Sequence, residues 1–267
     1  MLPMPPLLDN KHPNSPSVFR PTALLREARR QKRLAGVDVP PICILDPDGD
    51  IVRALQRTGK AQRFDGWPCY HTTLQTFTLA EKTVGILGGV VGAPFAVLVA
   101  EQLFASGCRF LLSLTSAGQI VAAGPPPYFV IIDRALRDEG TSYHYAAASD
   151  YGEADPRLVA MAVEALRAGN LHAVVGASWT TDAPFRETET TIASRRRDGI
   201  LAVEMEAASL YAFAAARKRP VICLAHVSNQ LGCIDGDFEK GDGNGAAGSL
   251  ALVTTLAAAW RRKSAVG

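Results

Sequence analysis

The most informative stretch of the sequence is Ala202-Val203-Glu204-Met205-Glu206-Ala207-Ala208-Ser209-Leu210-Tyr211. The apolar run at 200–203 predicts a strand that ends at the first glutamate, and 206–217 predicts a helix closed by Pro220. A glutamate buried at such a junction needs a hydrogen-bond partner or a ligand. Acidic residues also favour helix N-termini through the helix dipole, and without further context that is the more common explanation.

Strand and helix signals alternate on both sides of this junction. Short apolar runs predict strands at 42–45, 84–87, 110–114, 129–132, 173–175, 200–203 and 221–227. Apolar periodicity, caps and stop signals predict helices at 51–55, 93–106, 156–168, 206–217 and 250–262. This alternation predicts an α/β fold with a parallel or mixed sheet and helices on both faces. Ligands of such sheets bind at the carboxyl ends of the strands.

The overall charge excludes two classes of partner. The chain has 267 residues, with 28 basic and 26 acidic side chains and a formal net charge of +2. Proteins that bind nucleic acid or a membrane surface need a concentrated basic footprint, so we expect neither partner here. A small molecule is the default partner.

The first 40 residues differ in composition from the rest. They are rich in proline and contain a short basic helix candidate at 24–34, whose charges we expect to form a solvated face or a subunit contact. We therefore predict an N-terminal arm at 1–40 and a single domain at 41–267.

Two uncharged stretches, 83–100 and 111–132, approach the length of a membrane span. Both are interrupted by glycine and proline, so we expect buried strands that are followed by loops. The chain opens on no secretory signal pattern, and its five cysteines are widely spaced without a CxxC pair. Reduced thiols and a cytoplasmic location are the expectation.

Several segments resemble those of one enzyme family in the same order. They are Gly92-Ala93-Pro94, 103–108, Thr115-Ser116-Ala117-Gly118, 179–183 and the Val-Glu-Met-Glu motif at 203–206. From about residue 41 to the last helix, the chain resembles the nucleoside phosphorylase family, which includes uridine phosphorylase, hexameric purine nucleoside phosphorylase and methylthioadenosine nucleosidase. The resemblance implies a three-layer α/β/α fold with a central mixed, mostly parallel twisted sheet, assembled as a homodimer or homohexamer.

The same resemblance implies an enzyme that cleaves the N-glycosidic bond of a nucleoside, as a pentosyltransferase or a nucleosidase in nucleoside catabolism or salvage. Glu206 matches the family glutamate that holds the ribose hydroxyls, Met205 matches the methionine beneath the sugar, and Glu204 lies beside them. A carboxylate there stabilises the positive charge that develops on the ribosyl ring as the base leaves.

The acceptor site departs from the family pattern, because the family's phosphate-binding arginines are missing. Gly49 and Ser113 stand at two arginine positions, and 67–71 offers no third arginine. Each guanidinium lost removes about 1.5–3 kcal/mol of charge-assisted binding. Thr115, Ser116 and the Gly49 turn then form a phosphate or water site.

The nucleosidase branch of the family uses an acidic residue after the first strand as the base that activates water. Asp48 or Asp50 matches that position and is the candidate catalytic base. A turn that simply caps the helix at 51–55 is an equally good explanation of these aspartates. The acceptor stays open between phosphate and water, with a slight preference for hydrolysis.

The leaving group is expected to meet Asn229, in a Ser228-Asn229 pair where purine-cleaving members have Ser-Asp. An amide recognises a base but donates no proton at neutral pH. This favours a 6-oxopurine, a pyrimidine or a modified base over adenosine. The base pocket predicted from the resemblance comprises Ser228, Asn229, Gly118, Phe185 and Arg186.

Several other residues carry weaker sequence signals. Phe185 and Arg186 are equally well explained as a core aromatic and a surface arginine. Arg20 matches, in a variable arm, a histidine that some members lend to a neighbouring subunit. His71 and His144 are isolated, so we expect no metal and no cofactor. A catalytically degenerate nucleoside-binding or regulatory protein on the same fold is the alternative function, since fold does not fix function.

Overall fold

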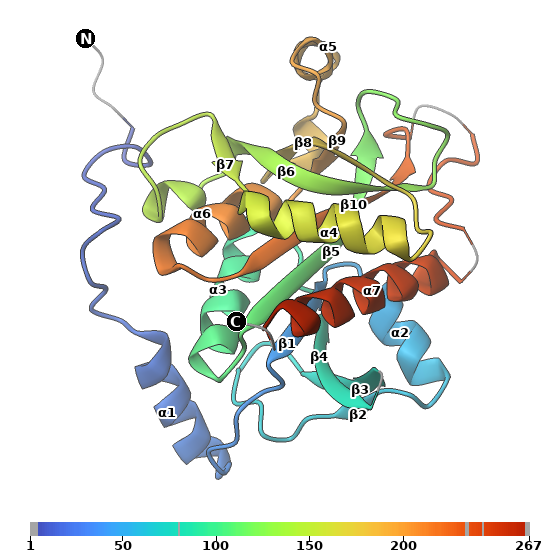
Figure 1. Ribbon diagram of the computed structural model, residues 1–267. Helices are drawn as coiled ribbons and strands as arrows, with labels where there is room; N and C mark the ends of the chain where they lie inside the picture. Colours follow the sequence, from blue (N-terminus) through green and yellow to red (C-terminus); the bar gives the residue numbers. More distant parts are fainter. Residues whose placement is uncertain (1–4, 80, 233–234, 242, 265–267) are drawn as a thin grey trace.

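The computed structural model describes residues 5–79, 81–232, 235–241 and 243–264. Ten strands form one sheet in the order β10-β6-β8-β9-β5-β1-β4-β3-β2, with β7 paired to β6 (Figure 1). The strands are β1 (Ile42–Asp46), β2 (Gln62–Arg63), β3 (Gln75–Leu79), β4 (Lys82–Gly88), β5 (Phe110–Gln119), β6 (Tyr128–Asp138), β7 (Tyr151–Glu153), β8 (Ala173–Thr181), β9 (Ala202–Glu204) and β10 (Val221–Asn229). The helices are α1 (Pro21–Lys32), α2 (Asp50–Arg57), α3 (Ala93–Ala105), α4 (Pro156–Ala168), α5 (Glu189–Arg197), α6 (Ala207–Arg217) and α7 (Ala246–Ser264).

The sheet is mixed and curls back on itself. β1 pairs in parallel with β4 and β5, and β10 pairs in parallel with β5. β10 also pairs antiparallel with β6, which joins β5 again through β8 and β9. The strands β5, β9, β8, β6 and β10 therefore form a closed ring, and β1, β4, β3 and β2 extend from it.

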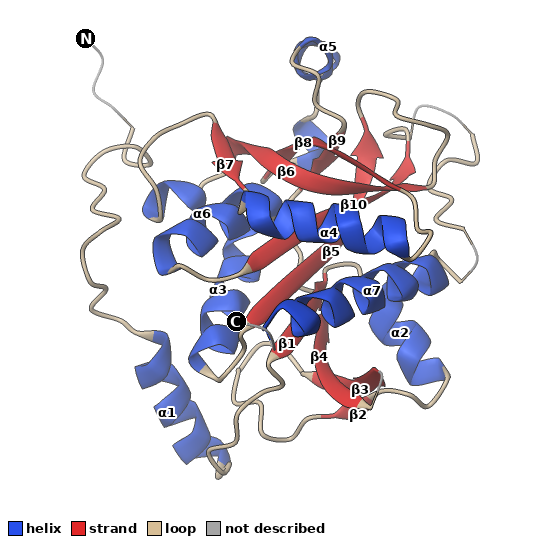
Figure 2. Ribbon diagram, in the orientation of Figure 1, coloured by secondary structure: helices blue, strands red, loops and turns tan. Residues whose placement is uncertain are grey.

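Helices cover the two faces of the sheet (Figure 2). Side chains alternate along β1: Cys43 and Leu45 join one buried cluster with α3 and α6, whereas Ile42 and Ile44 join another with α2, α4 and α7. This period of two is what a strand buried on both faces requires. The predicted α/β fold, with a mixed sheet between helical layers, is confirmed.

The differences from the prediction lie at edges and in polar segments. β2, β3, β7 and α5 were not predicted, because their sequences are short or polar and few of their residues are buried. β6 runs to Asp138 instead of ending at 132, since its charged residues still pair with β7 and β8. The stretch 83–100 holds β4 and the start of α3, while 111–132 holds most of β5 and the start of β6.

Within the described part of the chain, no helix combines the length and the apolar character needed to cross a bilayer. Cys43, Cys69, Cys108 and Cys223 are buried free thiols. Cys233 lies outside the described residues.

Helix α1 packs against the body of its own chain. Leu25 and Ala28 are fully buried, and α1 contacts α3. The Arg29 guanidinium donates to Ser106 Oγ at 3.3 Å, and Lys32 Nζ donates to the Pro68 and Cys69 carbonyls at 2.9 and 2.5 Å. Part of the basic run that was expected to be a solvated face or a subunit contact is thus used within the chain.

Candidate functional site

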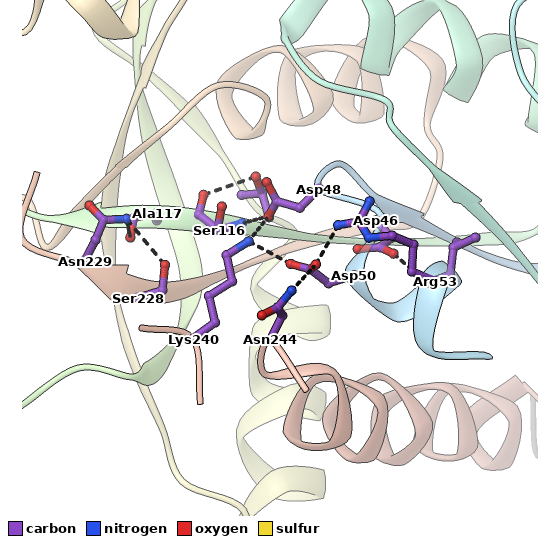
Figure 3. Close-up of polar contacts among 12 residues, drawn as sticks. Asp46, Asp48, Asp50, Arg53, Ser116, Ala117, Ser228, Asn229, Lys240 and Asn244 are labelled. Atoms are coloured by element: carbon purple, nitrogen blue, oxygen red, sulfur yellow. Dashed lines mark hydrogen bonds and ion pairs between the residues drawn. The ribbon is translucent and has the colours of Figure 1, made fainter. Parts of the chain in front are cut away.

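The carboxyl ends of three neighbouring parallel strands bring the predicted site residues to one edge of the sheet. The order is β10, β5, β1, with Leu45 opposite Ser113, His226 opposite Ser116, and Asn229 opposite Gly118. Parallel pairing in this register places the β1 turn, Ser116 and Asn229 side by side (Figure 3). Thr115 precedes Ser116 on β5. The sequence could predict this meeting because chain direction is common to parallel strands.

Glu204 is part of the framework of the site. Its Oε2 accepts hydrogen bonds from the Glu206 and Ala207 backbone N–H groups at 2.6 and 2.7 Å. Its Oε1 accepts from the hydroxyls of Ser178 and Thr180 on β8. Both oxygens accept hydrogen bonds within the chain, so this carboxylate ties α6 to β8. That Glu204 also contacts ribose stays a prediction from the resemblance.

Glu206 lies in a different environment although it is only two residues away. It is 1% exposed, and its Oε1 accepts from the Gly92 N–H at 2.7 Å. Its Oε2 is buried and has no hydrogen-bond partner among the described residues. Burial first, and then the nearby Glu204 charge, raise the pKa of Glu206 to about 8, against the smaller lowering effects of the Gly92 N–H and the Thr115 hydroxyl.

A buried carboxylate oxygen without a donor is costly, and it is retained where a ligand supplies the donor. Met205 is half-buried beside Glu206. The structure therefore keeps the predicted pair together at the start of α6.

The turn after β1 carries three carboxylates on Asp46, Asp48 and Asp50. Asp46 is 3% exposed, and its Oδ2 accepts from the Val52 N–H at 2.9 Å, so it caps the first turn of α2. Burial raises the pKa of Asp46 to about 6. Gly49 has a φ of 75°, and a Cβ there would lie 2.9 Å from Arg53 Nη1. An arginine at position 49 would be strained, because L side chains rarely adopt this left-handed conformation.

Asp48 and Asp50 are both held by one cation that sequence reasoning missed, Lys240. Lys240 Nζ lies 2.7 Å from Asp50 Oδ2 and 3.3 Å from Asp48 Oδ2. Asp48 Oδ2 also accepts from the Ser116 backbone N–H at 2.9 Å. In Figure 3 the Lys240 side chain reaches between the two aspartates. The lysine lies 190 residues after Asp50, so no local pattern could indicate this contact.

Asp50 has two further partners. Arg53 Nη2 pairs with its Oδ1 at 2.6 Å, and Asn244 Nδ2 donates to the same oxygen at 3.4 Å. Burial opposes ionisation of Asp50, but Lys240 and Arg53 outweigh it and lower the pKa below its usual value. Of the two predicted base candidates, Asp50 is thus enclosed by cations, whereas Asp48 keeps 32% of its side chain exposed.

A small cavity of about 10 Å³ lies among these groups. Its lining includes Asp46, Asp48 and Asp50 from the β1 turn, Thr115 and Ser116 from β5, and Lys240. This volume is about what one water molecule needs. His226 also lines the cavity; burial and then the Lys240 charge lower its pKa to about 4, so it is neutral at pH 7.

Asn229 and Ser228 lie on the far side of Ser116 from the aspartates (Figure 3). Asn229 Nδ2 donates to the Ala117 carbonyl and to Ser228 Oγ, both at 3.4 Å, and its Oδ1 accepts from the Leu231 N–H at 3.0 Å. A Cβ on Gly118 would lie 2.1 Å from Leu231 Cδ2. A larger residue at position 118 would therefore clash with the Leu231 side chain.

The remaining predicted residues are not brought to this edge within one chain. Phe185 is 98% exposed on a short turn, Pro184–Arg186, and Arg186 is exposed beside it. Their place in the base pocket stays a prediction, because a single chain leaves both side chains exposed. Arg20 is also exposed, with its Nε near the Ser17 carbonyl at 3.4 Å. Among the described side chains, no group of His, Cys, Asp or Glu is arranged to hold a metal ion.

Comparisons with known proteins identify the family of this chain. A family model described as the phosphorylase superfamily matches residues 41–258. A DeoD-type purine nucleoside phosphorylase of Roseobacter denitrificans is 29% identical over 163 residues, which are 58% of this chain and 68% of that protein. A guanosine phosphorylase of Halorubrum lacusprofundi is 25% identical over 158 residues, or 58% of this chain and 62% of that protein.

Two solved structures show the same fold. A purine nucleoside phosphorylase of Toxoplasma gondii, in complex with immucillin-H, superimposes with a TM-score of 0.73 at 15% identity, covering 87% of this chain and 96% of that one. A uridine phosphorylase of Vibrio fischeri has a TM-score of 0.69 at 18% identity, covering 82% and 90%. The family model spans most of the chain, including the β1 turn, Glu206 and Asn229. This chain therefore belongs to the nucleoside phosphorylase family within the phosphorylase superfamily.

Proposed function

We propose that the protein cleaves the N-glycosidic bond of a nucleoside and that water is its preferred acceptor. The observation that carries the proposal is the Glu206 carboxylate, which is 1% exposed and whose Oε2 has no hydrogen-bond partner among the described residues. Two ribose hydroxyls are the donors that this oxygen lacks. As the bond to the base breaks, positive charge grows on the sugar, and a carboxylate held to its hydroxyls stabilises that charge.

The preference for water rests on the charges beside Ser116. Lys240 and Arg53 are balanced by Asp48 and Asp50, with which they form ion pairs. Asp46 adds a third carboxylate. A site without net positive charge holds a phosphate dianion poorly, and a cavity of about 10 Å³ suits one water.

Asp48 is the better placed of the two candidate bases. It lies near enough to Glu206 for its charge to raise the pKa of that residue, and it is bound to Ser116 at the cavity. In the proposed reaction the water oxygen bonds to C1′ and gives a proton to Asp48. The electron pair of the broken bond leaves with the base, which takes a proton from solvent, and Asp48 returns the proton of the attacking water to solvent. Asn229 recognises that base, which favours a 6-oxopurine, a pyrimidine or a modified base.

A homodimer or homohexamer, as the family resemblance implies, is part of the proposal. Phe185 is 98% exposed and Phe19 is 72% exposed, and a subunit contact over these rings would remove apolar surface from water. Light scattering on the purified protein measures the assembly directly, and a monomer at micromolar concentration would contradict this part.

The test of the reaction uses a panel of nucleosides with and without inorganic phosphate. We expect free base and free ribose in both conditions, with the product identified by chromatography. Release of base only with phosphate, together with ribose 1-phosphate, would refute water as the acceptor. Binding without turnover of any nucleoside would favour the alternative, a degenerate nucleoside-binding protein.

A pair of variants tests the role of Glu206. Glu206→Gln removes the charge at the proposed ribose site, whereas Glu164→Gln makes the same change at an exposed position of α4. We expect kcat/KM to fall by roughly a hundredfold or more in the first and to stay unchanged in the second. Full activity of Glu206→Gln would remove the basis of the ribose site.

A further inference from the structure

We propose that Asp48 serves as an internal anion that fills the acceptor subsite and keeps external phosphate out of it. This inference deepens the proposed function and rests on it for the role of the cavity beside Ser116. Its structural basis is that two donors from distant parts of the chain, the Ser116 N–H and Lys240 Nζ, converge on the same oxygen, Asp48 Oδ2.

The contacts of Asp48 are those of a bound anion. A backbone N–H at 2.9 Å and an ammonium group at 3.3 Å are the kinds of donor that hold a phosphate or carboxylate oxygen. The Lys240 side chain is only 20% exposed, so its charge is directed to the cavity and is screened little by solvent. The donors for an anion are thus present, and the chain supplies the anion itself.

Asp50 does not fill the same place. It accepts from Lys240 at 2.7 Å, but it also pairs with Arg53 at 2.6 Å and accepts from Asn244 at 3.4 Å. The Ser116 N–H donates to Asp48 Oδ2 instead. Asp50 therefore pairs with both Lys240 and Arg53, whereas Asp48 accepts the hydrogen bond of the Ser116 N–H. Removing Asp48 takes away one of the two carboxylates that pair with Lys240 and makes the local charge more positive by one unit.

The position of Asp48 allows it to be removed without damage to the core. It lies on the turn between β1 and α2 with 32% of its side chain exposed, and the Val52 N–H is capped by Asp46 instead. Asp48→Ala is expected to fold. Asp48→Ser is a second variant that also removes the charge and retains a small polar group.

Inorganic phosphate is the probe, and calorimetry and thermal shift at constant ionic strength are the readouts, with chloride as the control anion. We expect Asp48→Ala and Asp48→Ser to bind phosphate roughly ten- to a hundredfold more tightly than the wild-type protein, the effect of one charge-assisted hydrogen bond. The double variant Asp48→Ala/Lys240→Met is expected to lose this gain, because its cation is absent. Asp48→Asn, which keeps the bulk of the side chain, is expected to gain less.

The outcomes separate this inference from the proposed function. Phosphate binding is measured without any nucleoside, so it does not depend on turnover. If the wild-type protein hydrolyses nucleosides but neither single variant gains phosphate affinity, the internal-anion inference is wrong and the proposed function stands. A gain that persists in the Lys240→Met background would also overturn the inference, because the anion would then be bound elsewhere. Phosphate-dependent turnover by the wild-type protein would refute the hydrolytic proposal itself.

Discussion

Replacing Glu206 by glutamine should make the protein more stable at alkaline pH while it lowers kcat/KM. The carboxyl is 1% exposed, and burial together with the Glu204 charge raises its pKa from 4.5 to about 8. Between these values the folded state keeps a proton that the unfolded state has released. The stability contributed by the protonated group is therefore present below pH 4.5 and is lost as the pH rises through about 8.

The size of this effect follows from the pKa difference. A rise from 4.5 to about 8 corresponds to up to about 5 kcal/mol in the free energy of unfolding. Glutamine has the same shape and stays neutral, and its amide oxygen can still accept from the Gly92 N–H. Wild type and Glu206→Gln should thus have similar stability at pH 5, and the variant should be more stable by several kcal/mol at pH 8.5.

Urea unfolding followed by circular dichroism at pH 5, 7 and 8.5 measures the difference. Glu164→Gln, an exposed change of the same type, should follow the wild-type pH dependence throughout. A constant difference between wild type and Glu206→Gln across this range would refute the reasoning, because it would mean that the carboxyl titrates alike in the folded and unfolded states.

Three further predictions concern chemistry and framework. In steady-state assays kcat/KM should rise with pH through about 8, because an ionised Glu206 stabilises the sugar cation; a flat profile from pH 6 to 9 would contradict this. Asn229→Asp should raise the relative rate of adenosine cleavage by roughly tenfold or more, most strongly at acidic pH. The facing Ala117 carbonyl favours a protonated carboxyl, which can donate to the base. An unchanged preference across the nucleoside panel would count against Asn229 as the base-recognition residue. Thr180→Val should lower the unfolding free energy by about 1–3 kcal/mol, because it leaves the Ala208 N–H without its acceptor and removes a donor to Glu204. A loss of unfolding free energy below the error of the urea titration would argue against a stabilising role of these hydrogen bonds.

The buried parallel strands were the easiest part of the fold to predict. β1, β4, β5 and β10 are apolar on both faces, so their sequences contain uninterrupted runs that few other structures tolerate. Only Phe77 is buried in β3, and β7 has three residues, so neither stands out from a loop. The closure of the ring through β10, β5 and β6 was not predicted, since strand order depends on contacts between distant segments.

The two glutamates of one motif show that the sequence could not predict which side chains at the site would find hydrogen-bond partners. Glu204 and Glu206 were predicted together as ribose-binding, and their spacing gives no reason to separate them. The structure distinguishes them, because hydroxyls from β8 reach Glu204 Oε1, while Glu206 Oε2 meets no described donor. Which carboxylate is satisfied depends on the strand that packs beside it.

The sequence by itself determined the family and the layered α/β architecture, because the order of the motifs and of the strand and helix signals can be read from it directly. It also indicated the edge of the sheet where the candidate site lies, because parallel strands share one direction. The absence of arginine at Gly49 and Ser113 was also visible there. Only the tertiary structure decided the charge of the acceptor site, since Lys240 returns from a loop 190 residues after Asp50 to pair with both aspartates. Electrostatic environment depends on proximity in space, and folding brings together charges that no local pattern connects.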